Sequence, residues 1–88
     1  MIKKTIIVQN KLGLHARPAA MVVGEASRFG SEIHLNKDGL EVNAKSIMGV
    51  MMLAAEMGSQ IIITANGEDE KLAIQALEIL FASKFDEE

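Results

Sequence analysis

Residues 32–44, EIHLNKDGLEVNA, decide the fold that we expect for this chain. Their first half alternates polar and apolar residues, which places Ile33 and Leu35 on the core side of a strand. The tripeptide KDG at 37–39 is typical of a tight hairpin turn. The alternation resumes after the turn, so the stretch predicts an antiparallel hairpin with one apolar side and one polar side.

The remaining sequence adds strands and helices on either side of this hairpin. Runs of β-branched residues favour strands, and apolar residues at helical spacing favour helices. In chain order we expect a strand at 4–8, a helix at 16–29, strands at 32–36 and 40–44, a helix at 47–54, a strand at 60–65 and a helix at 69–83. This order predicts an α+β domain with one sheet, helices on one face and water on the other. The residues expected on the water-facing side are polar: Thr5, Glu32, His34, Asn36, Glu41 and Asn43.

The composition predicts a single domain over residues 1–88 and excludes several kinds of site. Without cysteine there is no disulfide, thiolate ligand or cysteine nucleophile, and no need for an oxidising compartment, so we expect a cytoplasmic protein. With only two histidines, His15 and His34, no metal site is expected. A net charge of −3 and only three aromatic residues argue against nucleic-acid binding. No stretch approaches the roughly 20 apolar residues that span a bilayer, so no membrane insertion is expected.

One candidate for chemistry lies at 14–20, LHARPAA, where a loop enters the first predicted helix. Pro18 suits a first helical turn, because its missing N–H removes no helical bond. The N–H groups of Ala16 and Arg17 are then free beside the His15 imidazole, and the helix dipole adds positive potential. The Arg17 guanidinium can bind phosphate oxygens, so the group suits a transient phosphohistidine on His15. The alternative is a histidine that merely lies near a helix start, beside a solvated arginine.

A second candidate is Ser46, which precedes the short predicted helix at 47–54. The serine is expected to cap that helix, and it is also a possible phosphorylation site, because the helix dipole tolerates the added negative charge. The helix is apolar nearly all round, although it can bury only one side, for which Val50 and Leu53 are best placed. Methionine at helical spacing more often belongs to a core, but here the geometry favours an exposed docking surface. Its expected members are Ile47, Met48 and Met51.

Residues 10–19, NKLGLHARPA, resemble the active-site signature of the HPr family, the histidine-containing phosphocarriers of the bacterial phosphoenolpyruvate-dependent phosphotransferase system. Residues 45–51, KSIMGVM, resemble the regulatory-serine region of the same family, and the resemblance covers essentially the whole chain. It implies an open-faced β-sandwich, in which three helices lie on one face of a four-stranded antiparallel sheet.

The resemblance also implies a function. His15 would accept a phosphoryl group on Nδ1 from phospho-enzyme I and pass it to the IIA domains of sugar permeases, with Arg17 assisting. The protein would then be a covalent relay without a cofactor, and a monomer is expected. Ser46 would be modified by an HPr kinase/phosphorylase, which slows phosphorylation of His15 and in some bacteria promotes binding to a transcriptional regulator. The implied docking face comprises Ala16, Ala20, Ile47, Met48 and Met51.

The end of the chain, FASKFDEE at 81–88, departs from this picture. It resembles the tail of the nitrogen-related HPr paralogue, which relays phosphate to a regulatory IIA protein, whereas the Ser46 region resembles the sugar-type form. The branch therefore stays open, and a more distant alternative is a small α+β regulatory module without covalent chemistry. The last residues, 86–88, are expected to be frayed.

Overall fold

The computed structural model describes residues 1–87 and has the predicted order of elements, with one addition at the end. The elements are β1 (Ile2–Ile7), α1 (Ala16–Ala26), β2 (Glu32–Lys37), β3 (Leu40–Asn43), α2 (Ile47–Met52), β4 (Gln60–Asn66), α3 (Glu70–Ala82) and η1 (Lys84–Asp86). The addition is η1, a short turn after α3 that the sequence pattern did not predict.

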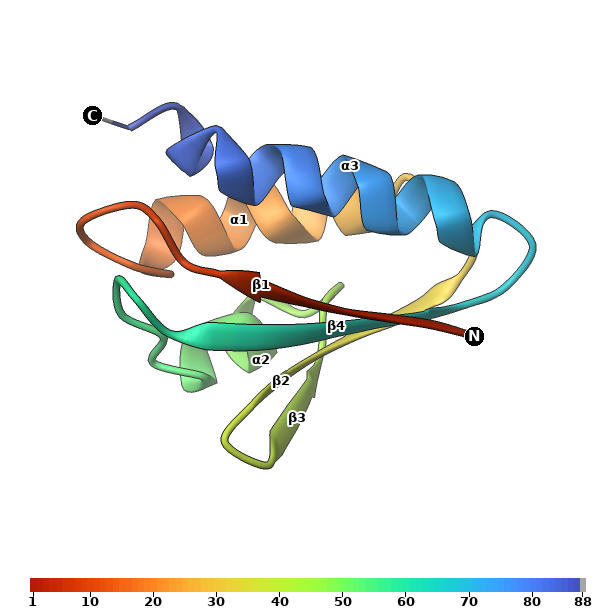
Figure 1. The fold of residues 1–88 in the computed structure, drawn as a ribbon, viewed down its shortest axis with the longest axis horizontal. Helices are drawn as coiled ribbons and strands as arrows, with labels where there is room; N and C mark the ends of the chain where they lie inside the picture. The colour runs from red at the N-terminus through yellow and green to blue at the C-terminus, as the bar shows by residue number, and fades with distance from the viewer. Residues whose placement is uncertain (88) are drawn as a thin grey trace.

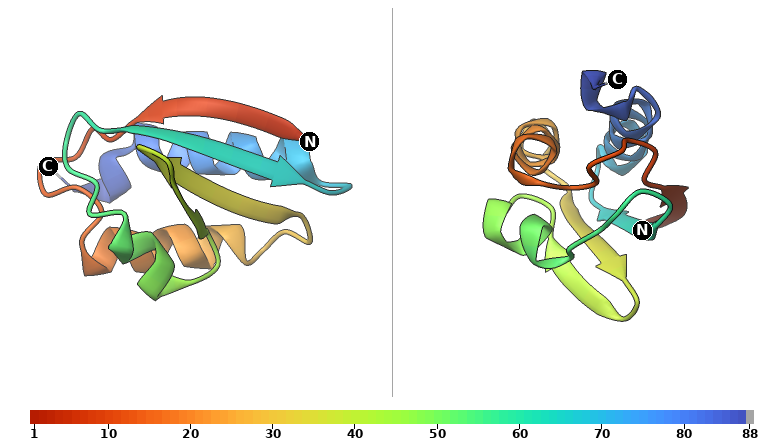
Figure 2. Two further views of the ribbon diagram at one scale, coloured as in Figure 1. Left: turned by 90° about the horizontal axis from the view of Figure 1, so that it is seen from below. Right: turned by 90° about the vertical axis from the view of Figure 1, so that its left-hand side faces the viewer.

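The four strands form one antiparallel sheet in the order β1-β4-β2-β3. Leu35 of β2 lies opposite Ile63 of β4 and Val42 of β3, so these buried side chains share one face. Figures 1 and 2 show α1 and α3 side by side over that face, with α2 next to α1 near β3. No helix within residues 1–87 covers the opposite face, and none of the six polar residues predicted there is buried. The predicted open-faced sandwich is therefore confirmed.

The core lies between the sheet and the two long helices. Only one side of β1 faces the core. On that side Lys4 points toward α3, where its Nζ lies 3.4 Å from Oε2 of Glu78, and Val8, just after the strand, is fully buried. The largest fully buried side chains are Phe81, Phe85, Ile33, Leu35, Ile61, Ile63 and Leu77. Two of these are phenylalanines near the end of the chain, which ties the C-terminal segment to the core.

Several predicted element ends differ from the observed ones by one to three residues, and two of these differences have a clear physical cause. The first helix ends at Ala26 rather than at Phe29, because the next N–H groups, those of Arg28 and Phe29, bond three residues back and form a tighter turn. The first strand spans Ile2–Ile7 rather than 4–8, because Lys3 pairs with Thr64 at the edge of the sheet.

Candidate functional site

His15 immediately precedes α1 as its N-cap residue, with extended backbone (φ −76°, ψ −171°). Its carbonyl accepts a hydrogen bond from Ala19 N–H at 2.9 Å, but its side chain makes no capping bond, so the half-exposed imidazole is free for other contacts. The first N–H groups of a helix have no partner within the helix. Because Pro18 has no N–H, the free donors at this helix start are the N–H groups of Ala16 and Arg17, the two residues that follow His15.

The loop before α1 is held firmly at both ends. Gly13 has φ +69°, a conformation that glycine adopts without strain, and a Cβ at this position would collide with the backbone carbonyl oxygen of Ala55. The same carbonyl accepts a hydrogen bond from Leu14 N–H at 2.9 Å, and the Leu14 side chain is buried. The buried Asn10 amide donates to the Gly13 carbonyl at 2.8 Å. His15 is therefore displayed from a fixed turn.

The structure brings an unpredicted carboxylate, that of Glu87, to this site. Its Oε2 lies 2.9 Å from Nε2 of His15 and 3.7 Å from Nη1 of Arg17. Its Oε1 accepts a hydrogen bond from Nδ2 of Asn10 at 3.0 Å. The bond from Asn10 is the largest cause that lowers the pKa of Glu87, followed by the hydrogen bond and charge of His15 and the charge of Arg17, against a partial desolvation that raises it. Glu87 is therefore ionised at neutral pH.

The expectation of a frayed tail was wrong for Asp86 and Glu87, while residue 88 lies outside the described residues. Three consecutive residues, 84–86, have φ between +55° and +58°, which turns the chain back after α3. The fully buried Phe85 anchors this turn, and Glu87 N–H donates to the Lys84 carbonyl at 2.9 Å. Figures 1 and 2 show the turn after α3 close to the loop that leads into α1. The one signal in the sequence was Phe85 itself, a lone large apolar residue in a polar segment.

Ser46 caps α2 as predicted: its Oγ accepts a hydrogen bond from Gly49 N–H at 3.1 Å. Val50 and Leu53 are buried, so the predicted core pair of this helix is also correct. The side chains expected to be exposed are exposed: Ile47 (45%), Met48 (76%) and Met51 (43%). Met52 is exposed as well, which the sequence did not indicate, and Ala16 and Ala20 are exposed on α1, which packs against α2.

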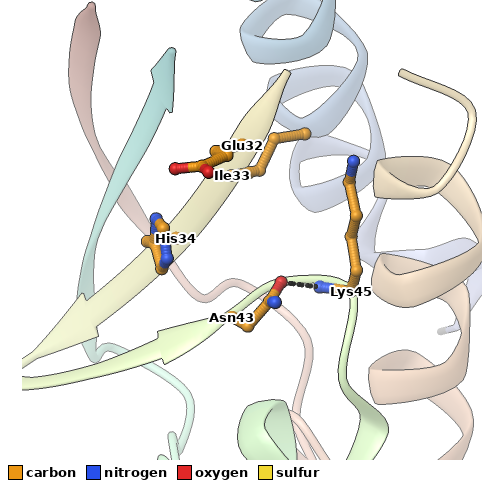
Figure 3. Close-up of a pocket in the computed structure, with 5 residues that line it drawn as sticks. All are labelled: Glu32, Ile33, His34, Asn43 and Lys45. Carbon is orange, nitrogen blue, oxygen red and sulfur yellow. Dashed lines mark hydrogen bonds between the residues drawn. The ribbon is translucent and has the colours of Figure 1, made fainter. Parts of the chain in front are cut away.

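His34, the second histidine, belongs to a different part of the surface. It lies on β2 in a small hollow with Glu32 and Asn43, and Figure 3 shows Asn43 accepting a hydrogen bond from Lys45 N–H. The Lys45 ammonium donates a hydrogen bond to the Phe29 carbonyl at 2.7 Å.

No group of three His, Asp or Glu residues within 1–87 is placed to hold a metal ion. None of the helices in the same part of the chain has the length and apolar character needed to cross a membrane.

Comparison with known proteins gives consistent matches over the whole chain. The family described as "PTS HPr component phosphorylation site" matches residues 2–83. Phosphocarrier protein HPr of Treponema pallidum (strain Nichols) is 53% identical over 88 residues, which is 100% of both chains. The crystal structure of an HPr from Thermoanaerobacter tengcongensis superposes with a TM-score of 0.96 at 52% identity, covering 100% of this chain and 99% of the other. A structure of an HPr dimer from the same organism gives 0.80 at 52% identity, covering 99% and 100%.

Proposed function

This chain belongs to the HPr family of phosphocarrier proteins of the phosphotransferase system, and we propose that His15 is the residue on which it carries the phosphoryl group. The observation that supports this assignment is the grouping at the start of α1. A half-exposed imidazole lies beside the free N–H groups of Ala16 and Arg17 and the exposed Arg17 guanidinium. A nucleophilic nitrogen next to an anion-binding helix end is what reversible phosphorylation requires.

The transfer step follows from this arrangement. The lone pair of Nδ1 of His15 attacks the phosphorus of the donor, and a nitrogen–phosphorus bond forms. The bond between phosphorus and the donor atom breaks, and its electron pair leaves with the donor. The ring becomes positively charged, while the new phosphoryl oxygens face the Ala16 and Arg17 donors. Unloading is the reverse step, with an acceptor side chain as the nucleophile.

The exposure of the Arg17 guanidinium matters as much as its charge. Arg17 is 60% exposed, and its guanidinium lies 3.7 Å from the carboxylate of Glu87. A water-accessible cation attracts phosphate without holding it tightly, since solvent screens the interaction. The exposed Arg17 guanidinium therefore suits a carrier that must release its phosphoryl group. The protein itself is a relay rather than a catalyst, because it needs one partner to load it and another to unload it.

For the partners, we infer phospho-enzyme I as donor and IIA domains of sugar permeases as acceptors, with the chain acting as a monomer in the cytoplasm. The exposed apolar side chains of α2, together with Ala16 and Ala20 on the adjacent α1, support a shared docking face. Ser46 at the end of that helix is partly exposed and is the proposed target of an HPr kinase/phosphorylase. A phosphate there would change both enzyme I docking and binding to a transcriptional regulator.

One experiment tests the assignment to His15 directly. The protein is incubated with phosphoenolpyruvate, Mg²⁺ and enzyme I, and its intact mass is measured. We expect one acid-labile phosphate on the wild type and none on His15→Ala, with His34→Ala retaining full labelling as the matched control. No mass gain with an active enzyme I would favour the non-covalent regulatory module. Preferential unloading to a regulatory IIA protein instead of a permease IIA domain would favour the nitrogen-related branch.

A further inference from the structure

We propose that Glu87 is a positioning residue for phosphoryl transfer, which holds the His15 ring through Nε2 so that Nδ1 is presented to the phosphoryl donor. The proposal rests on His15 being the phosphorylated residue. The two residues are 72 positions apart in the sequence, yet Nε2 and Oε2 lie 2.9 Å from each other.

The direction of this hydrogen bond follows from the chemistry of its two ends. An ionised carboxylate can only accept hydrogen bonds. Glu87 accepts one from Asn10 at its other oxygen, so Nε2 of His15 must donate to Oε2. In a neutral imidazole only one nitrogen carries a proton, so this contact leaves Nδ1 with its lone pair free.

The carboxylate is itself held in place. The Asn10 side chain is fully buried, and its Nδ2 donates both to Oε1 of Glu87 and to the Gly13 carbonyl. On the chain's own side, the buried Phe85 fixes the turn that immediately precedes Glu87. Catalytic groups work best when a second layer of contacts fixes their orientation. Asn10, Glu87 and His15 thus form a chain in which each member orients the next.

The same contact stabilises the charge that develops during transfer. When Nδ1 attacks phosphorus, the ring becomes cationic, and the Nε2–H bond to Glu87 strengthens as positive charge accumulates. The phosphoryl group adds at Nδ1 and leaves Nε2–H in place, so the contact is compatible with both the free and the loaded carrier. Arg17 lies farther from Glu87, at 3.7 Å, and is mostly exposed, so it is free to turn toward the phosphate.

The test compares Glu87→Ala, Glu87→Gln and a matched control, Asp86→Asn. The control removes the same charge from the adjacent residue, whose side chain is exposed and forms no ion pair among the described residues. One readout is the NMR signal of the His15 Nε2–H proton, which we expect to be protected from solvent in the wild type and in Asp86→Asn, and lost to exchange in Glu87→Ala. Glutamine can still accept through its oxygen, so Glu87→Gln should retain the signal.

The second readout is the rate of transfer from phospho-enzyme I under saturating conditions. We expect Glu87→Ala to be about tenfold slower than wild type, with the half-saturating concentration unchanged, because a charge-assisted hydrogen bond is lost in the transition state. Glu87→Gln should be intermediate and Asp86→Asn equal to wild type. An unchanged Nε2–H signal in Glu87→Ala, an equal slowing in Asp86→Asn, or a faster Glu87→Ala would each overturn the proposal. If wild type took up no phosphate, the assignment of His15 would fail separately, since the Nε2–H signal needs no phosphate donor.

Discussion

The ring of Phe85 packs edge-on against the ring of Phe81, with 4.9 Å between their centroids and 67° between their planes. Both rings are fully buried, so this contact attaches the end of the chain to the core beneath α3. It also determines where Glu87 lies, because only one residue, Asp86, separates Phe85 from Glu87 in the sequence. The position of the Glu87 carboxylate thus depends on an aromatic contact at the core.

Phe85→Ala is therefore expected to have two effects. Loss of the buried ring should lower the free energy of unfolding by about 3 kcal/mol, measured by urea denaturation. Release of the turn should also remove the contact between Glu87 and His15, seen as loss of the protected His15 Nε2–H signal. Phe29→Ala is the control: Phe29 is only partly buried, so its loss should cost about 1 kcal/mol and leave the signal intact. A tail that stays in place without the Phe85 ring would show that η1 is held by its backbone alone.

The contrast between His15 and Glu87 shows how far the sequence alone predicts this protein. Alternation such as that of Ile33 and Leu35 is local, and it predicted the antiparallel pairing of β2 and β3 correctly. The placement of His15 and Arg17 together at the start of a helix was also predicted correctly, because the two residues are neighbours in the chain. Glu87 was missed because its role depends on a left-handed turn and on a buried ring, and because its partner lies 72 residues away. The hydrophobic periodicity of the sequence does not predict a contact between residues so far apart in the chain.

Gly13 and Gly24 should respond in opposite ways to replacement by alanine. Gly13 has positive φ and no room for a Cβ, so Gly13→Ala should lower the free energy of unfolding by more than about 2 kcal/mol and displace the loop that carries His15. Gly24 lies inside α1 with open space around it, so Gly24→Ala should raise stability by about 0.5–1 kcal/mol. Chemical denaturation measures both. Equal changes in the two variants would contradict the assigned backbone constraint at Gly13.

Asp69 should make part of the stability depend on pH. Its carboxylate accepts hydrogen bonds from the Ser31 hydroxyl, from Gly30 N–H at 2.9 Å and from Ser31 N–H at 3.0 Å. These bonds, that of the Ser31 hydroxyl most of all, hold the pKa of Asp69 below its usual value of 3.8. Because the folded pKa is depressed, the stabilisation is complete above the unfolded value and is lost as the pH falls through the folded one.

Asp69→Asn should therefore be less stable than wild type at neutral pH, and the difference should shrink as the solution becomes more acidic. Urea denaturation at a series of pH values measures both proteins. Asp38→Asn is the control, since Asp38 is 87% exposed in its ion pair with Lys37 and should contribute little at any pH. A deficit of Asp69→Asn that persists unchanged into strong acid would mean that lost packing, and not the charge, is responsible.

Met48 provides a test of the docking face. It is 76% exposed on α2, so Met48→Gln should leave the unfolding midpoint unchanged and weaken binding to enzyme I. The expected loss is roughly tenfold in affinity, because a buried apolar anchor contributes about 1–2 kcal/mol to an interface. Leu72→Gln, at the start of α3 and far from the start of α1 (Figure 1), is the control, with 61% exposure and no expected effect on binding. Calorimetric titration with enzyme I would show both results, and equal weakening by the two variants would rule out a specific face.

Ser46 separates a structural role from an electrostatic one, because one residue caps α2 and lies at the end of the proposed docking helix. Ser46→Ala should cost about 1 kcal/mol of stability through loss of the bond to Gly49 N–H.

Ser46→Asp and Ser46→Asn both retain a capping oxygen, but only the first adds a charge. If a phosphate on Ser46 inhibits by repelling an acidic surface of enzyme I, Ser46→Asp alone should slow association at low salt. The rate should recover as salt shortens the screening length from about 30 Å at 0.01 M to about 3 Å at 1 M. Stopped-flow association kinetics decide the matter: slowing by both variants, or by neither, would mean that repulsion is the wrong explanation and that the phosphate acts through its size or through the helix.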